Sequence, residues 1–238
     1  MKDLVTIVIP CKNEKNVILK TLDLLNYQAG IHNVKVIICD ASNDGITKSD
    51  LIARLESKNR RDTFDLYITE GGLPAIARNN GFKIVKTPYV LFMDADVFLL
   101  DPKTIKRSLL LAIKKDLDLT TVKFRSDNGK YNYVFKTFDV IQRLIKPFSP
   151  FCIGGFMMFN KKTFDNLGRF DELATVAEDY LLSKKVSSNK FKKTNKTIFT
   201  LPRRFEKKGV LYMVVLMIQS FFNRNNNKFF SNHKTYWT

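Results

Sequence analysis

The fold is decided by the stretch YVLFMDAD, residues 89–96, in which five mostly apolar residues run directly into two carboxylates. An apolar run without polar alternation is typical of a strand that is buried on both faces. Similar runs occur at residues 4–9, 34–39, 64–68 and 119–124, and helical patterns separate them. Strands that alternate with helices predict an α/β fold with a mostly parallel sheet flanked by helices.

The size and composition of the chain favour one sizeable core. It has 238 residues, of which 45% are hydrophobic, too many for a disordered polymer. No apolar run reaches the roughly 18 residues of a membrane-spanning helix, and no secretory signal is visible. Three widely spaced cysteines predict reduced thiols and no zinc cluster. We therefore expect a single globular domain made in the cytoplasm.

Basic residues are concentrated near the end of the sequence. The formal net charge is +17, and residues 183–238 hold thirteen Lys or Arg with the single acid Glu206. A nearly continuous apolar run follows at residues 209–218. A helix of about 14 residues spans roughly 21 Å, less than the hydrocarbon core of a bilayer. We interpret this element as lying on an anionic membrane surface, with a buried core or dimer helix as the alternative. No nucleic-acid reading motif accompanies the charge.

Polar residues follow three of the predicted strands. Pro10 and Glu14 come after the first strand, Asp40 after the second, and Asp94 and Asp96 after the fourth. Ligands of open parallel sheets bind outside the carboxyl ends of the strands. We therefore expect these side chains to converge on one rim.

The carboxylates of this rim suggest a metal and a nucleotide. Asp94 and Asp96 are two positions apart, so in an extended segment both face one ion, and hard oxygen ligands suit Mg²⁺ or Mn²⁺; the alternative is a solvated turn. Asp40 is placed to accept from a ribose hydroxyl or a base N–H, or to form an Asx turn. Glu14 either contacts the nucleoside or stabilises the first turn of a helix.

Two further groups are candidates for the same site. Arg78 lies in a helical pattern after Gly71 and Gly72, and its forked guanidinium suits a diphosphate or a carbonyl group, or else an ion pair with a rim acid. Glu178 and Asp179 precede a helix-like run, where they either cap the helix or place a general base against an acceptor hydroxyl.

Taken in order, these pieces resemble the family 2 inverting glycosyltransferases, whose fold is called GT-A. The resemblance covers about residues 4–205. We therefore assign residues 1–205 to a GT-A domain and residues 206–238 to the basic, apolar C-terminal element. The matching segments are VTIVIP (5–10) with Asn13 and Glu14, DASNDG (40–45), ARNNG (77–81), DAD (94–96), FDE (170–172) and EDYLL (178–182).

The resemblance implies transfer of a sugar from a nucleoside diphosphate sugar, usually a UDP-sugar, to a hydroxyl acceptor with inversion. It implies a nucleotide pocket, an ion of Mg²⁺ or Mn²⁺, and a base. The nucleotide pocket would be lined by Pro10, Glu14, Asp40 and Arg78, with Asp94 on the ribose or the metal. Asp96 would hold the metal, Asp179 would be the base, and Glu178 would shape the acceptor pocket.

Departures from the family pattern refine this interpretation. The Gln-x-x-Arg-Trp motif of processive synthases is absent; the only Trp is Trp237, and the nearest analogue is Arg203-Arg204-Phe205. We therefore expect one sugar per encounter, with the two arginines on the donor diphosphate or on lipid phosphates. The apolar element predicts a lipid or lipid-linked acceptor at the inner face of the cell membrane.

Two other functions compete with this prediction. A sugar-phosphate nucleotidyltransferase would also combine an α/β nucleotide fold with acidic metal ligands, but it should carry a glycine-rich loop after the first strand, and residues 10–14 contain no glycine. The second is a non-catalytic membrane-binding module that keeps the fold.

Overall fold

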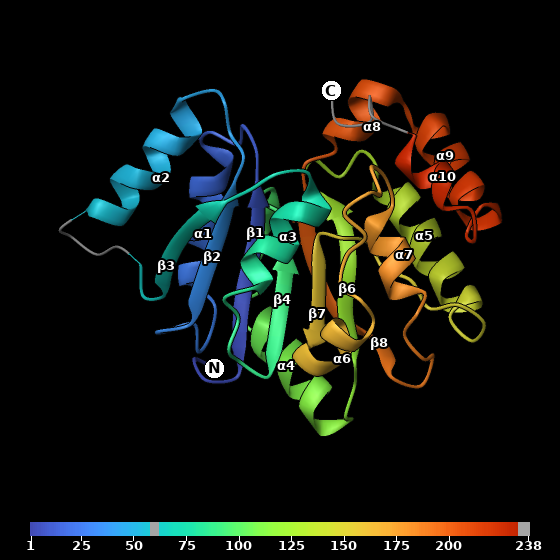
Figure 1. The fold of residues 1–238 in the computed structure, drawn as a ribbon, viewed down its shortest axis with the longest axis horizontal. Coiled ribbons are helices and arrows are strands. Elements are labelled where there is room, and N and C mark those ends of the chain that lie inside the picture. Colours follow the sequence, from blue (N-terminus) through green and yellow to red (C-terminus); the bar gives the residue numbers. More distant parts are fainter. Residues whose placement is uncertain (58–61, 233–238) are drawn as a thin grey trace.

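The computed structural model describes residues 1–57 and 62–232, which form one eight-stranded sheet with helices on both faces (Figure 1). The strand order is β3-β2-β1-β4-β7-β6-β8-β5. The strands are β1 (Val5–Cys11), β2 (Lys35–Asp40), β3 (Asp65–Glu70), β4 (Tyr89–Met93), β5 (Val97–Phe98), β6 (Leu119–Ser126), β7 (Phe156–Asn160) and β8 (Phe191–Thr200).

The sheet is parallel through its first half and mixed in its second. β3, β2, β1 and β4 run parallel, as do β6 and β8. β7 runs antiparallel to both β4 and β6, and β5 pairs antiparallel with β8. The carboxyl ends of β1, β2 and β4 consequently share one edge, at the top of Figure 1.

Alternate residues of the strands pack into two apolar clusters, one on each face of the sheet. Ile7 and Ile9 of β1 face a cluster that includes Ile18 and Ile105, whereas Val8 faces a second cluster that includes Phe164. This period of two is the signature of a strand buried on both faces. The helices are α1 (Val17–Asn26), α2 (Ile46–Glu56), α3 (Pro74–Phe82), α4 (Thr104–Lys114), α5 (Asn132–Ile145), α6 (Lys161–Asn166), α7 (Glu178–Ser183), α8 (Arg203–Lys208), α9 (Val210–Phe222) and α10 (Asn227–Ser231).

Helix α3 lies unusually close to the sheet. A Cβ atom at Gly81 would come within 2.4 Å of Val8 Cγ1 and 2.7 Å of Cys39 Sγ, so only glycine fits there. In the connection just before the same helix, Gly71 abuts the backbone of Asp40 and Ala41, and its N–H donates to the Asp40 carbonyl. These close approaches fix α3 over the ends of β1 and β2.

The C-terminal helices pack onto the domain at two places. Phe205 of α8 stacks on Tyr131 at the start of α5, with 5.3 Å between ring centroids. Leu216 of α9 and Phe230 of α10 join a small cluster with Val176 and Leu181. Within residues 1–57 and 62–232, no helix is long and apolar enough to cross a membrane. Residues 233–238, which include Trp237, lie outside the described part of the chain.

Candidate active site

Asp179, at the start of α7, is held by backbone donors. Its Oδ2 accepts from the N–H of Gly154 at 2.7 Å, and its Oδ1 accepts from the N–H of Tyr180 at 2.8 Å. Burial, and secondarily the like charge of Glu178, raise the pKa of Asp179 from 3.8 to about 7, although Arg78 opposes the shift. A half-buried carboxylate with this pKa exchanges protons readily near neutral pH.

Arg78 ties α7 to the end of β4. Its side chain is buried, its Nη1 donates to Glu178 Oε1 at 2.5 Å, and its Nη2 donates to Asp94 Oδ1 at 2.7 Å. The ring of Phe170 covers the guanidinium at 5.2 Å. The ion pair with rim acids, one of the two alternatives for this arginine, is therefore present. A Cβ at Gly154 would lie 2.8 Å from Arg78 Nη2, so glycine leaves the space that the fork needs.

A second arginine joins the rim from the C-terminal part of the chain. Arg203 Nη2 donates to Glu14 Oε1 at 2.6 Å and to Asp96 Oδ2 at 3.0 Å. Burial raises the pKa of both carboxyl groups. Arg203 therefore lies on the same rim as Glu14 and Asp96.

Asp94 and Asp96 do not share one partner as strand alternation predicts. The N–H of Val97 donates to the Asp94 carbonyl at 3.3 Å, which closes a turn. The turn sends the Asp94 carboxylate to Arg78 and the Asp96 carboxylate to Arg203. Strand geometry ends at Met93, so its period of two does not extend to these residues.

The rim suits a divalent cation that is only partly held by protein. Glu14 and Asp96 already enclose a positive group, and Glu14 Oε2 is buried without a hydrogen-bond partner. The described residues contain no group of three or more His, Cys, Asp or Glu that could hold a metal ion. An ion such as Mg²⁺ commonly takes one or two carboxylates and completes its shell with substrate phosphates and water. The residues present fit that arrangement.

Hydrogen bonds join the loops that follow β1 and β2. Asn13 Nδ2 donates to Asn43 Oδ1 at 2.8 Å, and the Asn43 N–H donates back to Asn13 Oδ1 at 3.0 Å. Asp40 Oδ1 accepts from the N–H and hydroxyl of Ser42, which is the predicted Asx turn. Asn13 was named among the matching segments of the sequence, but no contact was assigned to it there. In the structure Asn13 adopts a positive φ of 56°, a conformation that Asn tolerates better than most non-glycine residues.

The rim is continuous. Pro10 pairs with Cys39 at the ends of β1 and β2. Asp94 lies near enough to Asp96 and Glu14 that its like charge contributes to the raised pKa of both carboxyl groups. The predicted site residues thus follow one another along the carboxyl edge, from Asp40 at β2 to Asp179 at α7.

The sequence model of the family described as Glycosyl transferase family 2 matches residues 6–168. The chain belongs to this family. Its fold is the GT-A fold, and the predicted resemblance to the family is confirmed. Family membership favours a glycosyltransferase over a nucleotidyltransferase.

One curated relative matches about half of this chain in sequence. A poly(ribitol-phosphate) beta-glucosyltransferase of Bacillus spizizenii is 26% identical over 126 residues, which cover 53% of this chain and 20% of the relative. The chain therefore spans about a fifth of that curated relative.

Solved structures confirm the fold. TarS of S. aureus has a TM-score of 0.61 at 18% identity and covers 89% of this chain and 39% of its own. The mannosyltransferase PcManGT of Pyrobaculum calidifontis, in complex with GDP-Man and Mn²⁺, has a TM-score of 0.64 at 19% identity, covering 83% and 55%. TarS residues 1–349 were solved in complex with UDP, with a TM-score of 0.63 at 19% identity, covering 83% and 60%.

Proposed function

We propose that this family 2 chain is a glycosyltransferase that moves one sugar from a nucleoside diphosphate sugar, a UDP-sugar, to an acceptor hydroxyl with inversion, and that Asp179 is its general base. The placement of Asp179 carries the proposal: a half-buried carboxylate beside Arg78 and Glu178 whose pKa is raised to about 7. Base catalysis is most efficient when the pKa of the base lies near the working pH.

In the proposed step, Asp179 takes the proton of the acceptor hydroxyl while the oxygen of that hydroxyl attacks the anomeric carbon of the donor sugar. The attack comes from the face opposite the diphosphate, whose bond to that carbon breaks, and a single displacement of this kind inverts the centre. The N–H groups of Gly154 and Tyr180 fix the carboxylate in place. Glu178 holds Arg78 and raises the pKa of the base.

On the donor side, Pro10, Glu14, Asp40 and Asp94 would line the nucleotide pocket. Because both ends of the Arg78 fork are engaged with carboxylates, we assign it the positioning of Asp94. Arg203, half-exposed on the same rim, is the arginine that we place against the diphosphate.

Asp96, with Glu14 beside it, would hold Mg²⁺ or Mn²⁺, while Asp94 is engaged with Arg78. When bound, the ion would supply positive charge that stabilises the leaving diphosphate. The cation-binding character of the Asp96–Glu14 pair supports this, as does the Mn²⁺ of PcManGT.

We propose a lipid or lipid-linked saccharide as the acceptor, at the cytoplasmic face of the cell membrane. The support is the exposed apolar stripe of α9, at spacings of four, three and four residues. The α9 stripe consists of Leu211, Val215, Ile218 and Phe222. Basic residues at both ends of the helix complement anionic headgroups.

The base assignment is tested with Asp179→Asn. The variant should lose sugar transfer by at least about a thousandfold and keep its affinity for UDP in calorimetry. Asp116→Asn, which neutralises an exposed carboxylate paired with Lys190, is the matched control and should transfer normally. Transfer by Asp179→Asn at the normal rate would remove Asp179 from the mechanism.

A further inference from the structure

Helix α5 carries a second exposed apolar stripe, which the proposed acceptor and donor sites do not use. The α5 stripe consists of Tyr133, Val140 and Leu144 on the helix and Phe148 just beyond it, which are 62%, 53%, 67% and 89% exposed. Their spacing of seven, four and four residues keeps the helical members on one side. Exposing four large apolar side chains in a row is costly unless a partner covers them.

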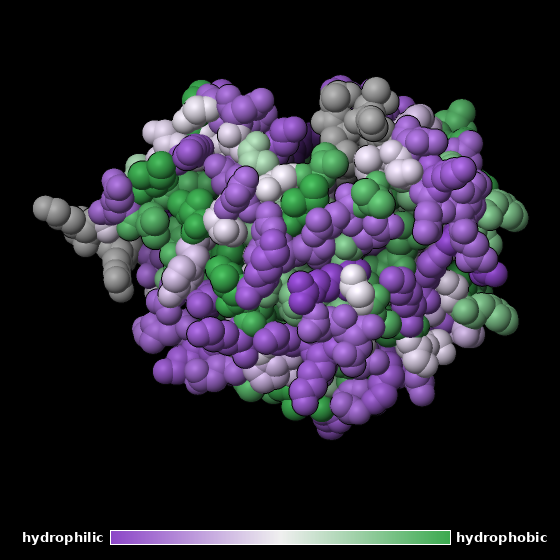
Figure 2. Space-filling model, in the orientation of Figure 1, coloured by the Kyte–Doolittle hydropathy of each residue, from purple (hydrophilic) through white to green (hydrophobic). Residues whose placement is uncertain are grey.

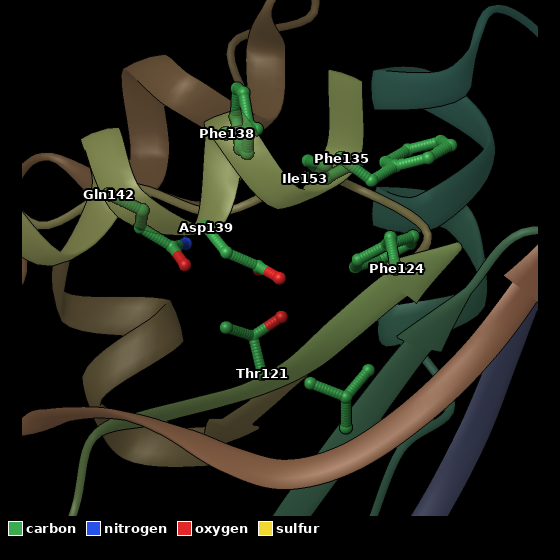
Figure 3. A pocket seen from close by; sticks show the side chains of 8 residues that line it. Thr121, Phe124, Phe135, Phe138, Asp139, Gln142 and Ile153 are labelled. Carbon is green, nitrogen blue, oxygen red and sulfur yellow. The ribbon is translucent and has the colours of Figure 1, made fainter. Parts of the chain in front are cut away.

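The opposite face of α5 is already packed, so the stripe is the face left over. Figure 3 shows Phe135, Asp139 and Gln142 of α5 directed toward Thr121 and Phe124, which belong to β6. The space between them is a cavity of about 10 Å³, which has room for about one water molecule. The inner face of α5 therefore offers no ligand site, and the outer stripe is the surface that needs an explanation.

The two stripes lie on one flank of the molecule. Phe205 contacts both Tyr131 and Phe135 of α5 at centroid distances of 5.3 and 5.6 Å, and α9 begins two residues after α8 ends. Figure 1 places α5, α9 and α10 on the same side, and Figure 2 shows apolar side chains projecting from that side over α9 and the end of α5.

This flank is positively charged. Lys136 and Arg143 are exposed on α5 beside the stripe, and Lys146 follows the helix. Asp139, the one acid between residues 128 and 150, is engaged by Arg125 at 2.9 Å and by a lysine of β8. A second copy of the chain would set like charge against like charge, whereas an anionic bilayer offers the opposite charge and an apolar interior.

We propose that α5 is a second lipid-contacting element, so that the α5 stripe and the α9 stripe dock together on an anionic bilayer surface. The inference rests on the membrane location in the proposed function and adds to it a contact within the catalytic domain. Single helices at an interface leave the protein free to rotate about them; two helices fix its orientation.

The fixed orientation concerns the proposed base, because α7 packs directly against α9 and is linked to α5 through Phe151. Phe151 contacts Phe138 of α5 at 5.2 Å and Tyr180 of α7 at 6.2 Å, while Leu216 of α9 packs with Leu181 of α7. A hydroxyl group carried at the lipid surface would thus meet the protein on the side where Asp179 is held.

The test is co-sedimentation of the full chain with vesicles of phosphatidylglycerol and phosphatidylcholine, and with phosphatidylcholine alone. Two substitution pairs probe the stripes: Leu144→Ser with Phe148→Ser on α5, and Leu211→Ser with Phe222→Ser on α9. Leu55→Ser with Leu110→Ser, on exposed positions of α2 and α4, is the matched control. All six side chains are exposed, so unfolding temperatures should not fall.

We expect each stripe pair to lower the partition coefficient on anionic vesicles about tenfold or more, since one buried Leu or Phe contributes that much. The control should partition as the unaltered chain. If the α5 pair binds as well as the unaltered chain while the α9 pair is weakened, the inference on α5 is wrong and the membrane location stands. If the unaltered chain itself fails to bind anionic vesicles, both the proposed membrane location and the proposed lipid contact of α5 are wrong. A dimer that dissociates in the α5 pair would make a second copy the occupant and would also overturn the inference.

Discussion

The raised pKa of Asp179 makes the pH profile of sugar transfer a direct probe of the site. An ordinary aspartate, with a pKa of 3.8, is about 94% ionised at pH 5, whereas a pKa of about 7 leaves about 1% ionised there. Because a base acts in its ionised form, kcat/KM should fall as the pH drops through 7 and should be about a hundredfold lower at pH 5 than on the alkaline plateau.

Glu178→Gln should move that midpoint in a known direction. The substitution removes the like charge that raises the pKa of Asp179 and also frees more of the Arg78 charge to lower it. Both effects act the same way, so the midpoint should move to lower pH by about one unit or more. Glutamine keeps an acceptor for Arg78, which preserves the fold.

The assay is release of the nucleoside diphosphate at subsaturating donor, because kcat/KM reports the free enzyme. Asp116→Asn is the matched neutralisation far from α7 and should leave the midpoint unchanged. A profile that is flat down to pH 5, or a midpoint that Glu178→Gln leaves in place, would refute the reasoning.

Three other substitutions test the rim. Arg78→Met strips two carboxylates of their buried cation, so the free energy of unfolding in urea should fall by about 3–5 kcal/mol; a loss under 1 kcal/mol would contradict the ion-pair geometry. Arg203→Gln removes the group that competes for Asp96, so Mn²⁺ should bind several-fold more tightly in calorimetry, and unchanged or weaker binding would speak against a metal there. Gly154→Ala adds a Cβ 2.8 Å from Arg78, so kcat should drop at least about tenfold with little change in UDP affinity, whereas normal kcat would show that the base tolerates the shift.

The strands of the first half were predictable because their signal is local. The apolar run at residues 89–93 coincides with β4, and the runs at 64–68 and 119–124 fall one or two residues from the observed bounds of β3 and β6. The place of β7 was not predictable, although its apolar stretch was evident. Its antiparallel insertion between β4 and β6 depends on long-range pairing, which periodicity does not encode.

The sequence predicted which residues lie along the rim better than it predicted which side chains contact one another. The rule for parallel sheets placed Asp40, Asp94 and Asp96 on one edge, because it depends only on strand direction. The partners of those acids come from elsewhere: Arg203 is 107 residues from Asp96 and 189 from Glu14. Side-chain partnerships over such separations follow from tertiary packing alone.

The carbonyl of Phe230 accepts from both the N–H and the hydroxyl of Thr175, four residues before Asp179. The last described helix, α10, therefore supports the segment that leads into α7 and the proposed base. Shortening the chain ahead of α10 would remove that support, and the resulting loss of turnover would reflect a loosened base even where vesicle binding is intact. Surface substitutions that keep the hydrogen bonds between Thr175 and Phe230 separate the supporting role of the C-terminal helices from their role in membrane contact.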